Sequence, residues 1–427
     1  MLRPQGQSAC SNPVLFAAVS LAVLMLALSA TPRVEAQALN VIHGFNGSPD
    51  GSAPWAGLVR DGAGNLYGTT TMGGEYGYGM VFKLTKRGSG WTLDPLYSFP
   101  QPNQGQDGAE PNAPVVIGPD GSLYGTTTMG GGNSGIVFKL TPPPQVCRTT
   151  ICPWNETVLY RFTGGDDGGN PYTPVILDAA GNIYGTTQSG GSANLGAVFE
   201  LSPTGSSWTE SVLYSFMGLP DDGSQPESGL VMDTAGNLYG TTADGGTGGS
   251  GTVFQLVRSG SGWTENILYS FGPMDGYAPF GGLIFDGSGN LFGTTAYSYS
   301  GDGTVFELSP AGGGQWNFTN IYFLTSGAPG VPGPVGTLLM DNSGNLFGTT
   351  FEGGIPGCGL GFGCGTLFEL SPVSGGGWTY NLLYQYMGQS DGGFPVDGLA
   401  HDSQGNLYGA GWGGGNSGNG VVFEWMP

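Results

Sequence analysis

The stretch Asp233-Thr234-Ala235-Gly236-Asn237-Leu238-Tyr239-Gly240-Thr241-Thr242 decides the fold of this 427-residue chain. Its central Leu-Tyr-Gly, or a close variant, occurs seven times at intervals of 53 to 61 residues. Self-similarity at a fixed period indicates a repeat architecture in which each copy is one supersecondary unit. The copies begin at Leu66, Leu123, Ile183, Leu238, Leu291, Leu346 and Leu407.

Each copy contains four short apolar runs rich in Val, Leu, Phe and Tyr and bounded by Gly, Pro, Asp or Ser. Such runs predict β-strands. No window shows a sustained helical period, so we expect almost no helix outside the N-terminal segment. In the fourth copy the predicted strands are Gly229–Asp233, Asn237–Thr241, Thr252–Leu256 and Ile267–Phe271.

The turn between the first two strands has the sequence Asp-x-x-Gly-Asn in six copies. The Asp side chain can accept the backbone N–H two residues on, and Gly supplies a positive φ, so the pattern predicts a tight hairpin. The six turns begin at Asp61, Asp178, Asp233, Asp286, Asp341 and Asp402.

The two ends of the chain are out of phase with the repeat. Val41–Phe45 aligns with the fourth strand of a copy, and Val421–Trp425 aligns with the third. A ring has a use for this offset, because the N-terminal strand can complete the last unit and remove the exposed edges. We therefore expect an all-β fold, a seven-bladed β-propeller with four antiparallel strands per blade, in one domain spanning residues 37–427.

The motif of the fourth copy resembles a known family. Asn237–Thr242, then Gly245-Gly246, then Gly251–Leu256 is similar to the GloVer tandem repeat, which is named for Gloeobacter and Verrucomicrobia. The resemblance covers all of residues 37–427 and implies a secreted or surface-anchored bacterial propeller, but no established activity. The Asp-x-x-Gly-Asn-Leu-Tyr hairpin also resembles kelch-like and NHL blades, which adds to the fold prediction alone.

Residues 1–36 have the features of a secretory signal peptide. An apolar run from Val14 to Ala30 precedes Val34-Glu35-Ala36, where small residues favour cleavage after Ala36. A transmembrane anchor is the alternative, although the run is shorter than a typical span. We therefore expect a secreted protein, extracellular or periplasmic, monomeric, and without a membrane span after processing.

Charge excludes some partners. Residues 37–427 hold 8 basic and 30 acidic residues, a net charge of −22. Because phosphate-binding surfaces need clustered Lys and Arg, we expect no nucleic-acid partner.

Four cysteines lie in two close pairs, Cys147 with Cys152 and Cys358 with Cys364. Four thiolates can bind zinc. The two pairs, however, fall in loops expected on opposite faces of non-adjacent blades. In an oxidising compartment the sequence favours two local disulfides.

The connections between the second and third strands, and between one repeat and the next, are long and variable, and both should emerge on one face. Binding residues concentrate on such loops, so we expect this face to carry the function. Four aromatic residues interrupt its Gly-rich loops and are candidates for stacking on a sugar or contacting a protein: Trp55, Tyr76, Tyr78 and Trp412. Packing over the blade ends is the alternative role.

Six inter-repeat loops carry Asp-Gly-x-x-Pro, with Asp at positions 50, 107, 167, 222, 275 and 391. A turn leading into the next strand is one interpretation of Asp50, Asp107, Asp167, Asp222, Asp275 and Asp391. The other is a ring of carboxylates near the channel mouth, able to bind a ligand or a Ca²⁺ ion held jointly by several blades. No loop has the ligand density of a dedicated calcium site, so no cofactor is expected.

Signs of catalysis are weak. The two histidines, His43 and His401, fall inside the repeat frame and are interpreted as strand residues. No catalytic residue is therefore named. The leading hypothesis is a non-enzymatic binding propeller for a glycan or protein. The alternative is a carbohydrate- or lactone-active hydrolase or lyase using carboxylates at the channel mouth.

Overall fold

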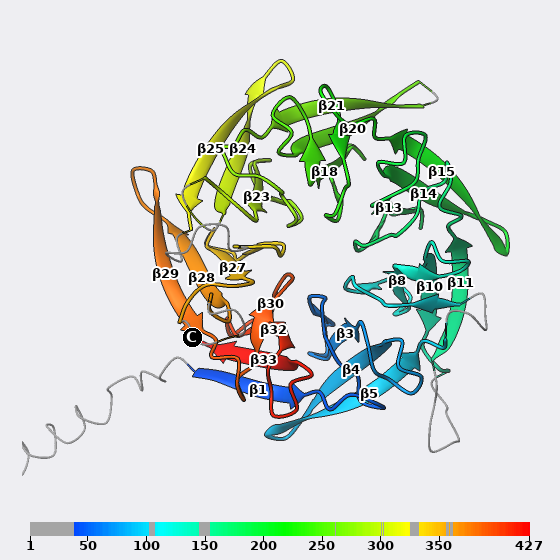
Figure 1. Ribbon diagram of the computed structural model, residues 1–427, viewed down its shortest axis with the longest axis vertical. Coiled ribbons are helices and arrows are strands. Elements are labelled where there is room, and N and C mark those ends of the chain that lie inside the picture. Colours follow the sequence, from blue (N-terminus) through cyan, green and yellow to red (C-terminus); the bar gives the residue numbers. More distant parts are fainter. Residues whose placement is uncertain are drawn as a thin grey trace, which may run out of the picture. The chain divides into compact units, whose positions relative to one another are not determined.

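The computed structural model describes residues 38–101, 107–144, 154–260, 262–299, 301, 303–324, 333–355, 358 and 362–427. In these residues every regular element is a β-strand. Seven antiparallel sheets, the blades, surround a common centre (Figure 1). The predicted seven-bladed β-propeller is therefore confirmed.

Blades 1 to 6 place their strands from the centre outward in chain order, and we call the four strand positions a, b, c and d. The a strands are β2 (Val59–Arg60), β7 (Val116–Ile117), β12 (Ile176–Leu177), β17 (Val231–Met232), β22 (Ile284–Phe285), β26 (Leu339–Met340) and β31 (Ala400–His401). The b strands, which carry the Leu-Tyr-Gly repeat, are β3 (Leu66–Thr70), β8 (Leu123–Thr127), β13 (Ile183–Thr187), β18 (Leu238–Thr242), β23 (Leu291–Thr295), β27 (Leu346–Thr350) and β32 (Leu407–Gly413).

The c and d strands are longer and form the outer part of each blade. The c strands are β4 (Met80–Arg87), β10 (Ile136–Thr141), β14 (Ala197–Thr204), β20 (Thr252–Ser259), β24 (Thr304–Gly312), β28 (Thr366–Pro372) and β33 (Val421–Met426). The d strands of blades 1 to 6 are β5 (Gly90–Ser98), β11 (Asn155–Arg161), β15 (Ser207–Ser215), β21 (Gly262–Ser270), β25 (Gln315–Phe323) and β29 (Trp378–Gln385).

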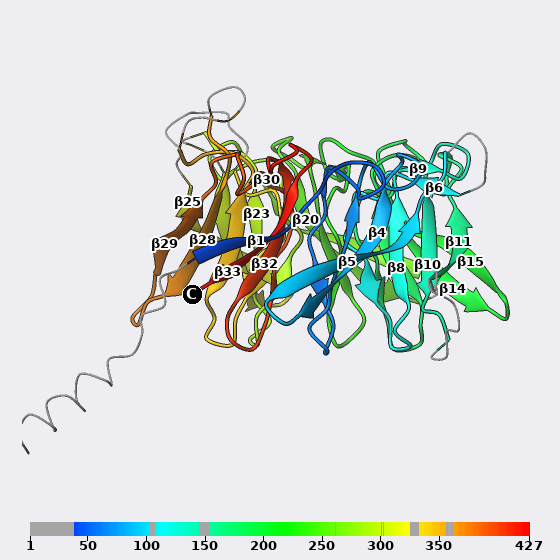
Figure 2. The ribbon, with the colours of Figure 1, turned by 90° about the horizontal axis from the view of Figure 1, so that it is seen from below.

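The N-terminal strand closes the ring, as predicted. β1 (Ala38–Gly44) pairs with β33 and serves as the d strand of blade 7, in the order β1-β33-β32 (Figure 2). The short β30 (Gly393–Pro395) and β31 both pair with β32. Blade 7 therefore joins the first and last strands of the chain.

The outer hairpins extend further than the sequence predicted. In blade 4, pairing between β20 and β21 continues to Ser259 opposite Gly262, so Trp263 lies inside strand d rather than in the connection. The guanidinium carbon of Arg258, which pairs with Trp263, lies 5.0 Å from the indole centroid. This cation–π contact helps to keep the hairpin paired beyond the apolar run.

The hydrophobic core lies between neighbouring blades. One cluster, for example, joins Tyr184, Val198 and Phe216 of blade 3 to Leu238 and Phe254 of blade 4. The rings of Phe216 and Phe254 meet edge to face at 5.1 Å, a geometry that aromatic pairs prefer. No blade buries both faces by itself, so the stacked ring is the folding unit.

The third residue of the Leu-Tyr-Gly motif in strand b must be glycine, because an aromatic ring occupies the space where a side chain would lie. A Cβ at Gly240 would lie 2.7 Å from Phe254 Cζ and 3.0 Å from Leu230 Cδ2. The repeat glycine is therefore a packing requirement of the interblade core.

The predicted a–b turn is also confirmed. Asp233 Oδ1 accepts the backbone N–H of Ala235 at 2.9 Å, and Gly236 has φ +83°. Asp233 Oδ2 accepts from the Asn237 amide and from Tyr239 Oη. These hydrogen bonds lower the pKa of Asp233 although burial opposes them.

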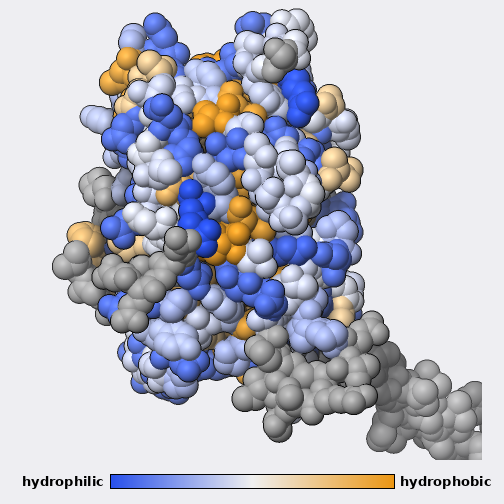
Figure 3. All heavy atoms as spheres, turned by 90° about the vertical axis from the view of Figure 1, so that its right-hand side faces the viewer, coloured by the Kyte–Doolittle hydropathy of each residue, from blue (hydrophilic) through white to orange (hydrophobic). Residues whose placement is uncertain are grey.

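Cys358 and Cys364 form a disulfide, as expected. Cys147 and Cys152 lie outside the described residues, so their expected disulfide stays a prediction. Viewed from the side, small hydrophobic areas are scattered among hydrophilic ones (Figure 3). Within the described residues no helix is long and apolar enough to cross a membrane.

Candidate functional site

The two sets of long connections lie on one face, as predicted, and we call it the upper face because it is uppermost in Figure 2. They also bond to one another. The d–a connection after blade 1 forms β6 (Gly108–Ala109), which pairs with β9 (Met129–Gly130) in the b–c connection of blade 2. After blade 3, β16 (Gly223–Ser224) pairs in the same way with β19 (Asp244–Gly245) of blade 4.

A cavity of about 230 Å³ opens at the centre of the upper face and receives side chains from all seven blades. Its lining includes the residue that follows the repeated proline before each a strand. This position, which we call Pro+1, holds Trp55, Asn112, Tyr172, Glu227, Phe280, Val335 and Val396 in blades 1 to 7. The chemistry of this position changes from aromatic to amide, carboxylate and aliphatic around the ring.

An unusual backbone conformation supports the Pro+1 side chains. In six blades the residue before the repeated proline is not glycine and has φ between 53° and 58°: Ala53, Glu110, Asn170, Gln225, Ala278 and Phe394. This conformation is costly for such residues and needs external support.

Hydrogen bonds from two blades supply that support. Gln225 N–H donates to the Leu195 carbonyl of blade 3 at 2.8 Å, and the Gln225 carbonyl accepts from Ala243 N–H of blade 4 at 3.0 Å. The neighbouring loops thus hold the strained residue from both sides and orient Glu227 towards the cavity.

Aromatic rings form part of the cavity wall. Five rings contribute to it: Trp55, Tyr172, Phe280, Tyr297 and Phe351. The Trp55 and Phe351 centroids are 6.1 Å apart, and Tyr297 stacks on Tyr277 at 5.1 Å. Such a wall offers flat apolar surfaces for a ligand to cover.

Two carboxylates also line the cavity, Glu227 from blade 4 and Asp397 from blade 7. Gln188 Nε2 donates to Glu227 Oε1 at 2.5 Å. Burial raises the pKa of Glu227, the Gln188 hydrogen bond opposes this rise, and the charge of Asp244 adds to it. Asp397 accepts the backbone N–H groups of Gly57 at 3.2 Å and Gly398 at 2.6 Å.

Tyr172 is coupled to both carboxylates. Burial raises its pKa to about 12, the charges of Glu227 and Asp397 add to the rise, and a side-chain hydrogen bond with Trp55 opposes it. Because the indole N–H of Trp55 can only donate, the Tyr172 oxygen accepts this bond. The Tyr172 hydroxyl therefore stays protonated near neutral pH and can donate to a ligand.

The structure separates the four aromatic residues singled out in the sequence. Trp55 lines the cavity, and Trp412, 37% exposed, lies against it with ring centroids 5.7 Å apart. Tyr78 packs against the core between blades 1 and 2. Tyr76 is exposed on the b–c loop of blade 1.

The six loop aspartates lie beside the outermost strands, whereas the second interpretation of their motif placed them in a ring near the channel mouth. Five of them accept a hydrogen bond from a tyrosine of the outermost strand of their own blade: Tyr97 to Asp107, Tyr160 to Asp167, Tyr214 to Asp222, Tyr269 to Asp275 and Tyr384 to Asp391. In blade 7, His43 replaces the tyrosine, and its Nε2 lies 3.2 Å from Asp50 Oδ1. These contacts place the aspartates beside strand d, and other residues line the cavity.

Three of these aspartates face a glutamate of the next blade. Asp107, Asp167 and Asp222 are coupled to Glu156, Glu210 and Glu265, respectively. Burial, followed by the charge of the neighbouring aspartate, raises the pKa of Glu156 and Glu210 to about 7 and that of Glu265 to about 8. In the described part of the chain no group of three or more His, Cys, Asp or Glu residues is arranged to hold a metal ion.

Sequence reasoning found Trp55 but missed Tyr172, Glu227, Phe280 and Asp397. The signal was present in the repeat itself. Aligning the seven copies on the repeated proline shows seven consecutive blades with Trp, Asn, Tyr, Glu, Phe, Val and Val at the next position. A position that varies in chemistry and faces a shared cavity is where a ligand can be recognised.

The fold and this central cavity define a β-propeller of the type that gathers one side chain per blade at its channel. A family model described as the Gloeobacter/Verrucomicrobia repeat matches residues 31–153 and 145–362. The chain belongs to this repeat family, as the motif resemblance implied. No curated protein matches the chain.

Three solved structures are similar in fold at low identity. A protein from Thermus thermophilus assigned as an oxidoreductase (glucose dehydrogenase) has 14% identity and a TM-score of 0.43, covering 92% of this chain and 100% of its own. A Dyadobacter fermentans protein of unknown function has 11% identity and a TM-score of 0.46, covering 91% and 98%. A Bacteroides uniformis protein assigned as a 6-phosphogluconolactonase has 15% identity and a TM-score of 0.47, covering 79% and 85%. Their activities are not transferred to this chain.

Proposed function

We propose that this propeller is a binding protein that holds one sugar-sized ligand, a free saccharide or the end of a glycan, in the cavity of the upper face. The observation that carries the proposal is the Pro+1 position, which supplies one side chain from each blade, of six residue types in all, to a single cavity. Variation at a position that faces a shared cavity is unnecessary for folding and useful for recognition.

The lining matches the chemistry of a sugar ring. A sugar has apolar C–H faces, which can stack on Trp55 or Tyr172, and hydroxyl groups around its edge. Hydroxyl donors bind strongly to carboxylate acceptors such as Glu227 and Asp397. The Tyr172 hydroxyl adds a donor for a sugar oxygen.

A hydrolase is the second candidate, and one observation favours it. Glycoside hydrolysis uses two carboxyl groups in different protonation states. Glu227, whose pKa is raised by burial, and Asp397, which accepts backbone N–H groups, are two carboxyl groups that line the same cavity in unequal environments.

The decisive experiment is calorimetric titration of the purified protein with a panel of monosaccharides and oligosaccharides. We expect at least one saccharide to bind and to change the fluorescence of Trp55. Glu227→Gln and Tyr172→Phe should each weaken that binding about tenfold, because each removes a polar contact in a desolvated site. Asp166→Asn, an exposed carboxylate in a d–a loop of the same face, is the charge-matched control.

Absence of binding across the panel, or equal binding by the three variants, would overturn the proposal. Incubating each bound saccharide with the protein and assaying for new reducing ends separates the two candidates. Release of product that Glu227→Gln abolishes would identify the protein as a hydrolase.

We also propose that the protein is exported through cleavage of residues 1–36 and is monomeric. The disulfide between Cys358 and Cys364 supports an oxidising compartment. Fractionating cells of the producing organism and sequencing the N-terminus of the exported form tests this, with Gln37 expected as the first residue. A cytoplasmic full-length chain would overturn it.

A further inference from the structure

We infer that the ligand of the central cavity carries an ammonium group, so that the preferred saccharide is an amino sugar. The inference rests on the proposed function and specifies its ligand. The structural reason is that two carboxylates and five aromatic rings line the cavity, whereas no Lys, Arg or His among the described residues does.

The negative charge of Glu227 is the main charge of the cavity that no described cation balances. Its one described side-chain donor is the neutral amide of Gln188. The other groups that face it electrostatically are Tyr172, which is neutral, and Asp244, which has the same sign. A buried carboxylate is costly unless a cation pairs with it. A cationic ligand would supply the missing partner.

Asp397 differs from Glu227 in how its charge is balanced. Its two oxygens already accept backbone N–H groups of blades 1 and 7. It therefore adds negative potential to the cavity while its position is fixed. We expect Glu227 to make the direct contact with the ammonium group and Asp397 to attract it at longer range.

The aromatic wall favours the same ligand chemistry. The faces of Trp and Tyr rings attract ammonium cations, and the attraction grows when water is excluded. Trp55 and Tyr172 are adjacent in the cavity and joined by a hydrogen bond, so they present a fixed pair of rings. The acidic balance of the chain also raises the local concentration of cations.

Calorimetry with matched probes tests the inference. Glucosamine has an ammonium group, glucose has a hydroxyl at the same position, and N-acetylglucosamine has a neutral amide. Choline is an ammonium ion without a sugar ring. We expect glucosamine to bind about tenfold more tightly than glucose or N-acetylglucosamine, as one ion pair with a cation–π contact allows. In Glu227→Gln the preference should fall below about threefold, whereas Asp166→Asn should retain it.

The outcomes separate the inference from the proposed function. Equal binding of glucose and glucosamine would overturn the ammonium inference and leave sugar binding standing. Binding of choline without binding of any sugar would support the ammonium inference and overturn sugar binding. No binding of any of the four probes by the protein would overturn the inference.

A pH series with choline, whose charge does not titrate, adds a readout for Glu227. Affinity for choline should fall as pH decreases through the raised pKa of Glu227, since the protonated carboxyl loses its charge. The fall should be absent in Glu227→Gln. A profile that is unchanged by this substitution would overturn the role assigned to Glu227.

Discussion

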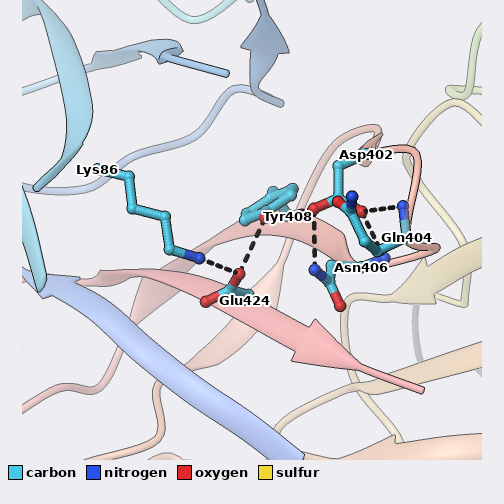
Figure 4. A network of polar contacts seen from close by, with 6 residues as sticks. All are labelled: Lys86, Asp402, Gln404, Asn406, Tyr408 and Glu424. Atoms are coloured by element: carbon cyan, nitrogen blue, oxygen red, sulfur yellow. Dashed lines mark hydrogen bonds and ion pairs between the residues drawn. The ribbon is translucent and has the colours of Figure 1, made fainter. Parts of the chain in front are cut away.

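The ammonium group of Lys86 lies 3.2 Å from Glu424 Oε1, an ion pair that joins blade 1 to blade 7 (Figure 4). The Glu424 side chain is only 7% exposed. Tyr408 Oη lies 2.9 Å from Glu424 and 2.9 Å from Asp402, and its single proton cannot serve both carboxylates. Lys86 therefore provides a donor and a positive charge where the ring closes.

Replacing Lys86 by Met should lower the free energy of unfolding by about 1 kcal/mol, because Glu424 loses its cation while staying largely buried. Chemical denaturation monitored by Trp fluorescence measures the change. Lys83→Met, on the same strand, is the control, since the Lys83 ammonium lies over the Tyr67 ring rather than against Glu424. Equal losses in both variants would show that the closing ion pair has no special role.

The interblade carboxyl pairs should make stability depend on pH. Burial and Asp222 raise the pKa of Glu265 to about 8, above its value in an unfolded chain. The folded state thus binds a proton that the unfolded state releases, and this stabilisation is present at low pH and is lost as pH rises through about 8. Glu265→Gln should therefore raise the melting temperature at pH 8.5 by about 1–3 °C and have little effect at pH 5.5.

The control for this experiment is Glu75→Gln, which removes an exposed carboxylate from the upper face. It should give the same melting temperature difference at both pH values. A Glu265→Gln variant that is less stable than the parent at pH 8.5 would contradict the sign of the effect. Four a–b turn aspartates, Asp61, Asp178, Asp233 and Asp402, act in the opposite direction, because their lowered pKa values remove stability only as pH falls below about 4.

Gly240→Ala should destabilise the protein by about 2 kcal/mol, because the new methyl group overlaps Phe254 and Leu230 in a filled core. Gly262→Ala is the matched control, since a Cβ there meets no atom within 4 Å. Differential scanning calorimetry of the two variants measures the contrast. The packing argument fails if both alanine variants melt at the temperature of the parent.

Removing the disulfide by Cys358→Ser with Cys364→Ser should lower stability by about 2 kcal/mol, the value expected for closing a short loop. Both cysteines pack in the core between blades 6 and 7, so the loss includes contacts of the sulfur atoms. Thermal unfolding of the double variant and of the parent protein, under reducing and oxidising conditions, measures the size of this loss in stability. If the parent contains no disulfide, the stability difference between parent and double variant will be the same with and without reductant. That result would contradict the bond.

The sequence predicted those features that each repeat encodes locally. The Asp233 turn follows from side-chain hydrogen bonding over four residues, and strand b follows from its apolar pattern. The pairing of β1 with β33 was also predictable, because the repeat phase at each end of the chain specifies which strand is missing.

The candidate site required information that no single repeat contains. Glu227 enters the cavity because Gln225 holds a strained conformation that loops of two blades support. The sequence leaves open whether the loop aspartates serve a turn or a carboxylate ring, because their tyrosine partners lie earlier in the chain, on strand d, and nothing in the local pattern indicates that hydrogen bond. Both features depend on how adjacent blades meet.

Blade 7 sets a condition on the time at which the protein can finish folding. Among the described strands, β1 is synthesised first and its partner β33 last. Pairing between such distant segments is slow and cannot begin until β33 has been synthesised. A chain that stops before Val421 lacks β33 and leaves the edges of β1 and β32 unpaired. The closing blade therefore works as a check on synthesis of the whole ring, because products truncated before β33 keep the open edges that invite proteolysis and aggregation.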